Sequence, residues 1–141
     1  MDKVGNKSLW PDFKFDDIKT PLAILQEQAN DLGVQTKNIL IGEIITTEAY
    51  DEPAHQMVLI YQFYIKAPIL SNYRYLLFRI LQRSSLYPFE IYFEHETPEQ
   101  VIIDTESQFM EKLKAIFYNP KTDEIIKNLY AQSMQMKNTV D

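Results

Sequence analysis

The sequence predicts a single α+β domain with an N-terminal helix, an antiparallel sheet of about four strands and a C-terminal helical hairpin. Apolar residues recur at helical spacing in residues 20–33, alternate as in strands between residues 38 and 94, and return to helical spacing in residues 105–136. Strands in one run and helices in another are typical of this class. The 141 residues suit one domain, which buries roughly two thirds of its unfolded surface without a disulfide or a metal.

The first helix has clear start and stop signals. Thr20 can serve as its N-cap, and Pro21 occupies the first helical position, where a missing N–H costs nothing. One apolar stripe follows: Leu22, Leu25, Ala29 and Leu32. We expect Gly33 to end the helix, because glycine readily adopts the left-handed conformation of a helix C-terminus.

Residues 1–19 are expected to form an N-terminal arm. Its apolar side chains are too numerous for a free tail, so we expect its second half to dock on the body: Leu9, Trp10, Phe13, Phe15 and Ile18. No apolar run follows Lys3 and Lys7, so a secretory signal is not expected. No stretch approaches the roughly 20 apolar residues that span a bilayer. We therefore expect a cytoplasmic protein without a membrane segment.

The central third predicts strands at residues 38–47, 56–66 and 89–94. Residues 73–83 fit both a helix and a strand, because their apolar positions satisfy either period. We favour a strand, since the neighbouring segments are strands and short turns flank it. The choice matters because it decides whether Arg79 and Arg83 share a face.

The last third is expected to be helical. After a short apolar run at residues 101–103, Thr105 to Gln108 matches the spacing of a capping box. An apolar stripe then extends to Phe117, and the Asn119–Pro120 pair interrupts it. A second helix is predicted from about Thr122 to Met136. We expect the two helices to form a hairpin that covers one face of the sheet.

Several functional classes lack their sequence signals. The chain has no cysteine, so disulfides, thiol nucleophiles and cysteine-based metal sites are absent. Its glycines, Gly5, Gly33 and Gly42, are isolated, whereas phosphate-binding loops and the nucleophile elbow need glycines at fixed spacing. His55 and His95 lie in acidic segments and could hold a metal with a carboxylate if their loops met, or act as a general base. Because they have no defined spacing, we predict no catalytic residue, no metal site and no cofactor.

All three arginines fall within one ten-residue stretch, Arg74, Arg79 and Arg83, in a chain of net charge −6. A guanidinium binds carboxylates and phosphates in two-pronged fashion and stacks on aromatic rings. In a structural interpretation, these arginines pair with carboxylates of neighbouring strands, such as Glu90 or Glu94.

Two functional interpretations compete with structural pairing. Arg79 and Arg83 could share one strand face with Tyr73 and Tyr75 and bind an acidic protein partner. They could instead clamp an anionic small molecule in an aromatic pocket. RNA binding is disfavoured by the acidic net charge and by the lack of lysine in the segment.

The hypothesis drawn from the sequence is a non-enzymatic cytoplasmic interaction domain of the adaptor or inhibitor type. Its expected partner is a protein, and its expected binding residues are Tyr73, Arg74, Tyr75, Arg79 and Arg83. The alternative is a domain that binds, or acts on, a small anionic ligand in an aromatic pocket. A homodimer through the C-terminal helices is a further hypothesis.

Overall fold

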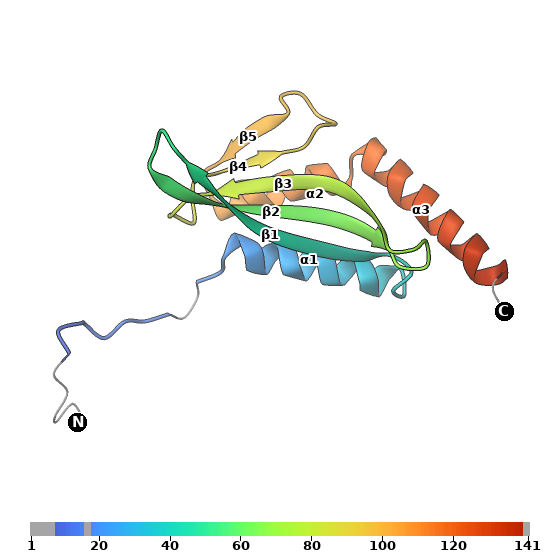
Figure 1. Ribbon diagram of the computed structural model, residues 1–141, viewed down its shortest axis with the longest axis horizontal. Coiled ribbons are helices and arrows are strands. Elements are labelled where there is room, and N and C mark those ends of the chain that lie inside the picture. Colours follow the sequence, from blue (N-terminus) through green and yellow to red (C-terminus); the bar gives the residue numbers. More distant parts are fainter. Residues whose placement is uncertain (1–7, 16–17, 140–141) are drawn as a thin grey trace.

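Helices and strands form two layers in the computed structural model, which describes residues 8–15 and 18–139 (Figure 1). The elements are, in chain order, α1 (Pro21–Gln35), β1 (Ile41–Asp51), β2 (Gln56–Ala67), β3 (Tyr73–Gln82), β4 (Phe89–Tyr92), β5 (Gln100–Ile103), α2 (Glu106–Phe117) and α3 (Pro120–Thr139). The strands form one antiparallel sheet in the order β1-β2-β3-β4-β5. The predicted α+β single domain is confirmed, with one N-terminal helix, two C-terminal helices and β5 as one strand more than expected. The predicted helical hairpin is wrong, because α3 continues away from the end of α2 instead of folding back along it (Figure 1).

The ambiguous segment is a strand. β3 pairs with β2 from Leu59–Gln82 at one end to Ala67–Tyr73 at the other. The favoured interpretation, a strand, is therefore confirmed. Pairing with β2 decides between strand and helix, because the length and the apolar pattern of the segment fit both.

Both predicted helix N-caps are confirmed. The Thr20 hydroxyl accepts a hydrogen bond from the Ala23 N–H at 3.0 Å, and the Thr105 hydroxyl accepts one from the Gln108 N–H at 3.1 Å. The Gln108 side chain also accepts a hydrogen bond from the backbone N–H of Asp104 at 2.7 Å. Each helix start thus satisfies backbone donors that have no partner inside the helix.

The predicted end of α1 is wrong by two residues. Gly33 lies inside the helix, which continues to Gln35 with Thr36 as its C-cap. The chain turns at Lys37 and Asn38, which have φ angles of 53° and 65°. Asparagine tolerates this left-handed conformation better than most residues, so the turn needs no glycine.

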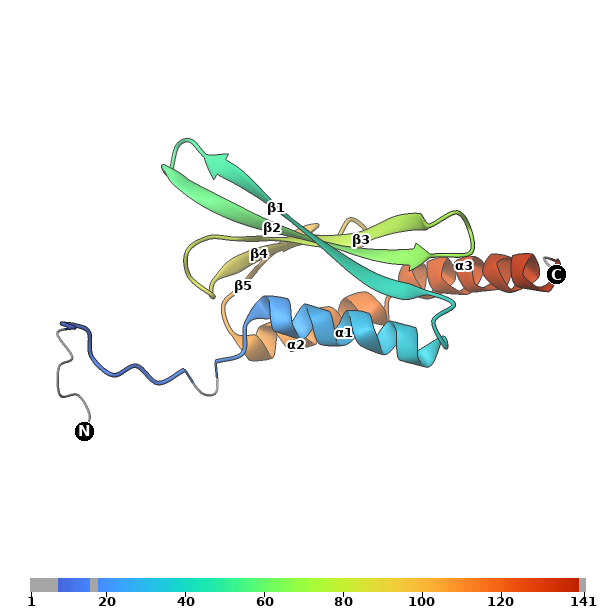
Figure 2. The ribbon, with the colours of Figure 1, turned by 60° about the horizontal axis from the view of Figure 1, so that its bottom comes forward.

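The three helices lie on one side of the sheet (Figure 2). We call the helix-covered side the inner face and the opposite side the outer face. The core lies between the layers and contains one continuous set of buried residues, which includes Ile24 and Leu25 of α1, Phe63 and Phe78 of the sheet, Phe109 and Ile116 of α2, and Leu129 of α3. In both views α3 extends past the end of the sheet (Figures 1 and 2).

The contact between α1 and β1 is unusually close at Gly42. A Cβ atom at this position would lie 2.5 Å from Ala29 Cα and 2.7 Å from Ala29 Cβ. A glycine is therefore required for α1 to approach the sheet this closely.

The described part of the N-terminal arm does not dock on the body, so that expectation is wrong. Leu9, Trp10 and Phe15 are 100%, 77% and 73% exposed. The rings contact one another instead, with centroid distances of 6.0 Å from Trp10 to Phe13 and 5.8 Å from Phe13 to Phe15. Residues 1–7 and 16–17 of the predicted arm lie outside the described residues.

Candidate functional site

A β-bulge in β3 decides which side chains share the outer face. Phe63 of β2 is opposite Phe78, but the next residue, Tyr64, is opposite Leu76, which leaves Leu77 as an extra residue. Successive strand residues point to opposite faces, so one extra residue reverses the alternation beyond it. An even-numbered residue before Leu77 therefore lies on the same face as the odd-numbered residues after it, and an odd-numbered residue before Leu77 lies with the even-numbered residues after it.

The bulge brings all three arginines to the outer face. Arg74 is opposite Lys66, and Arg79 is opposite Gln62. Lys66 and Gln62 are an even number of residues apart on the regular strand β2, so they point to the same face. Arg83 follows the end of β3 and contacts Glu90, which lies opposite Leu81 on the same face.

Tyr73 and Tyr75 point away from the arginines. They are opposite Ala67 and Ile65, which are core residues of the inner face. The expectation that they share a face with Arg79 and Arg83 is therefore wrong, and the bulge is the reason.

Tyr75 instead belongs to a small polar cluster at the edge of the core. Its hydroxyl lies 2.8 Å from His95 Nε2. Burial raises the pKa of Tyr75, and the negative charge of Glu94 and the neighbouring Tyr73 raise it further. The Tyr75 hydroxyl therefore remains protonated at neutral pH.

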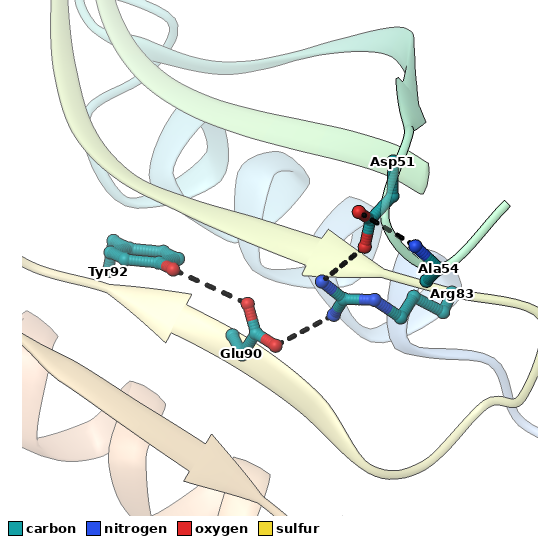
Figure 3. Close-up of polar contacts among 5 residues, drawn as sticks. All are labelled: Asp51, Ala54, Arg83, Glu90 and Tyr92. Atoms are coloured by element: carbon teal, nitrogen blue, oxygen red, sulfur yellow. Dashed lines mark hydrogen bonds and ion pairs between the residues drawn. The ribbon is translucent and has the colours of Figure 1, made fainter. Parts of the chain in front are cut away.

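Arg83 is the centre of an ion-pair network that joins three parts of the sheet (Figure 3). Its Nη1 donates to Glu90 Oε2 at 2.7 Å, and its Nη2 donates to Asp51 Oδ2 at 3.4 Å. The Tyr92 hydroxyl donates to the other oxygen of Glu90 at 3.3 Å. The hydrogen bond and charge of Glu90, and then those of Asp51, raise the pKa of the Arg83 guanidinium. The structural interpretation, pairing with Glu90, is confirmed for Arg83.

Arg74 is also paired within the sheet. Its Nε lies 2.8 Å from Glu43 Oε1 on β1, and its guanidinium carbon lies 5.8 Å from the centroid of the Tyr64 ring. Lys66 Nζ lies 3.9 Å from the other oxygen of Glu43. Glu43 thus forms ion pairs with two cations of the outer face.

Arg79 differs from the other two arginines. Its guanidinium stacks over the Tyr92 ring at 4.2 Å from the centroid, and it has no ion pair with any carboxylate of the described residues. It lines a shallow depression of about 160 Å³ together with Leu76, Tyr92, Glu94 and Glu99, among others. Leu76 is 39% exposed. We call Leu76, Arg79 and Tyr92 the Arg79 patch.

Most of the carboxylate partners in these networks have no signal in the sequence. Asp51 lies 32 positions from Arg83, and Glu43 lies two strands away from Arg74 in the sheet. Their carboxylates carried no distinguishing local pattern. The alternation of residues 89–94 is the sequence signal for Tyr92, because it places Tyr92 on the opposite face of the strand from Phe89 and Ile91.

The two histidines do not meet. His55 lies in the β1–β2 turn, where its Nδ1 is 3.5 Å from the Tyr50 hydroxyl, whereas His95 follows β4 and contacts Tyr75. Across residues 8–15 and 18–139, no group of three or more histidine, aspartate or glutamate side chains could hold a metal ion.

A second cavity, of about 450 Å³, opens on the inner side between α1 and the junction of α2 with α3. We call it the helix-side groove. Its lining includes strand residues Phe63, Ile65 and Leu77, apolar helix residues Leu32, Phe117 and Ile126, and Gln28, Asp31, Gln35, Tyr118 and Asp123. Because no arginine lines it, it is not the aromatic pocket for an anion that the alternative hypothesis requires.

No protein-family model matches the chain, and no curated protein or solved structure is significantly similar to it. Within the described part of the chain, no helix is both long and apolar enough to cross a membrane.

Proposed function

We propose that this domain is a non-enzymatic protein-interaction domain, of the adaptor or inhibitor type, that binds its partner through the Arg79 patch. One observation carries the proposal: Arg79 is held on a sheet face that no helix covers, and it lacks a carboxylate partner among the described residues. Arginine and tyrosine are the side chains enriched where binding energy concentrates in protein interfaces.

The patch favours a partner with a carboxylate flanked by apolar side chains. Tyr92 holds the Arg79 guanidinium by stacking, at 4.2 Å, so little side-chain freedom remains to be lost when a carboxylate binds. The exposed Leu76 offers an apolar contact beside it. Because cysteine is absent from the chain, a reducing compartment is favoured, and the proposed partner is a cytoplasmic protein.

A small anionic ligand fits the same patch less well. The depression of about 160 Å³ is smaller than the roughly 300–1,000 Å³ of most ligand pockets. Glu94 and Glu99 line it beside Arg79, and their charges repel a free anion. A protein surface can satisfy Arg79 with a carboxylate while it offers basic side chains to these two glutamates.

Site-directed photo-crosslinking in the native host tests this proposal. A photoreactive amino acid replaces Leu76 in the patch or, as the control, Met110 on α2, which is similarly exposed at 43%. We expect an adduct with one protein from position 76 that position 110 does not give. Arg79→Glu should abolish this adduct, whereas Lys137→Glu, the same change of charge in the last turn of α3, should leave it intact. Identical adducts from both positions, or an adduct that survives Arg79→Glu, would contradict the proposal.

A further inference from the structure

We infer that the helix-side groove is a binding site for a small hydrophobic cation, an ammonium compound with an aromatic or aliphatic body. This inference is independent of the proposed function. The groove lies on the inner side of the sheet and the Arg79 patch lies on the outer face, so a ligand in the groove leaves the patch free.

The groove has the size and the apolar floor of a small-molecule site. Its volume of about 450 Å³ lies within the roughly 300–1,000 Å³ of most ligand pockets. Phe63, Ile65 and Leu77 of the sheet form the floor. Leu32 and Ile126 from the helix walls are only partly buried. A ligand body that enters the groove covers these two side chains and removes its own apolar surface from water, which favours binding.

The charge of the groove is negative. Asp31 and Asp123 line it, and no basic side chain of the described residues does. Asp31 has no ion pair with any residue that the structure describes. Asp123 pairs with Lys127 at 3.0 Å, but both side chains are more than half exposed, so this pair is weak. The groove thus attracts a cation and repels an anion, and the net charge of −6 acts in the same direction.

The helix ends around the groove favour a cation as well. Residues 28–35 of α1 form one wall, and the carbonyl groups at the end of this helix carry the negative end of its dipole. α1 has no basic residue in its last turn to balance that end. The N-terminus of α3 has the opposite polarity, but Asp123 lies in its first turn and balances it.

An aromatic ring at the rim adds a further attraction. Tyr118, the C-cap of α2, lines the groove and is 78% exposed. Lys114 Nζ lies 6.0 Å from the centroid of the Tyr118 ring, but Lys114 does not line the groove. The face of an aromatic ring attracts ammonium groups. A ligand ammonium at the rim is therefore attracted by the Tyr118 ring as well as by the two aspartates.

Titration of the full chain with two matched probes tests this inference. Naphthylmethylammonium and naphthylacetate share one ring system and differ in the sign of their charge. Amide chemical shifts of the isotope-labelled chain report both the affinity and the place of binding. We expect the ammonium probe to bind about tenfold more tightly than the carboxylate probe, with shifts centred on groove residues such as Leu32, Leu77 and Ile126. Salt should reduce the difference between the probes.

Variants of the same size identify the groups that select the cation. Asp31→Asn should weaken binding of the ammonium probe about threefold, and Asp31→Asn with Asp123→Asn should remove most of its advantage over the carboxylate probe. Glu111→Gln, the same loss of charge at an exposed position of α2 outside the groove, is the matched control and should change neither affinity. Thermal unfolding checks that the variants are folded. The inference is overturned if neither probe shifts the groove amides, if the unmodified chain binds both probes equally, or if loss of both aspartates leaves the preference unchanged.

Discussion

Arg74 and Arg79 point to the same side of β3, although five positions separate them and a regular strand would place them on opposite faces. The extra residue of the bulge, Leu77, reverses the alternation between them. All three arginines consequently lie on the outer face, but Arg74 and Arg83 form ion pairs with carboxylates of β1 and β4. Arg79, held by Tyr92, is the one that remains for a partner within the described structure.

Arg83 should contribute more to stability than Arg74 does. Its side chain is 34% exposed and contacts two carboxylates, whereas the Arg74 side chain is 46% exposed and contacts one. We expect Arg83→Ala to lower the free energy of unfolding by about 1 kcal/mol, and Arg74→Ala to lower it by less. Denaturant unfolding of both variants measures the difference, which salt should reduce. Equal losses of unfolding free energy in the two variants would show that the contact between Arg83 and Asp51 does not contribute to stability.

Gly42 should be intolerant of a side chain. Because a Cβ atom would meet the backbone of Ala29 at 2.5 Å, Gly42→Ala must push α1 away from β1. We expect a loss of about 1–3 kcal/mol in the free energy of unfolding. Gly33→Ala is the matched control, since its Cβ would meet two side-chain atoms, the Asn38 oxygen at 2.9 Å and Ile41 Cγ2 at 3.7 Å, instead of a neighbouring backbone. There the cost is offset by a gain of about 1 kcal/mol in helix propensity. A larger loss at Gly33 than at Gly42 would contradict this packing.

Stability should fall in alkaline solution because burial raises the pKa of Tyr61, Tyr75 and Tyr87. In the unfolded chain a tyrosine ionises near its ordinary pKa of about 10. Above that pH the unfolded state loses protons that the folded state retains, so the stabilising contribution is complete below about pH 10 and is lost as pH rises through the higher folded pKa. Urea unfolding at a series of pH values measures the slope. Tyr75→Phe should make this slope shallower, and an unchanged slope would exclude Tyr75 as a contributor.

Local signals in the sequence were sufficient for most of the fold. Thr20 and Thr105 identify two helix starts because an N-cap depends on the few residues beside it. The alternation in β2 and β4 predicts their strands for the same reason. β5 was missed as a strand because it has four residues and its apolar Ile102 is 53% exposed on the outer face, so no alternation of polar and apolar residues marks it.

The candidate site depended on relationships that lie outside any local window. The bulge at Leu77 exists because of the register between β2 and β3, and without it Tyr73 and Tyr75 were expected beside Arg79 and Arg83. The Arg83–Asp51 ion pair joins segments 32 residues apart. The clustering of the arginines is visible in the sequence. Identifying the arginine that has no carboxylate partner, however, requires the pairing of all five strands.

The most direct test of the central claim is affinity capture from the native host with Arg79→Glu and Arg83→Lys compared in parallel. Arg79→Glu reverses the charge that is proposed to bind the partner and breaks no ion pair in the described structure. Arg83→Lys weakens the internal network but keeps its charge. We predict that a protein captured by the unmodified domain is lost with Arg79→Glu and retained with Arg83→Lys, both variants being folded. Retention of that protein by Arg79→Glu would contradict the claim that this domain binds through the Arg79 patch.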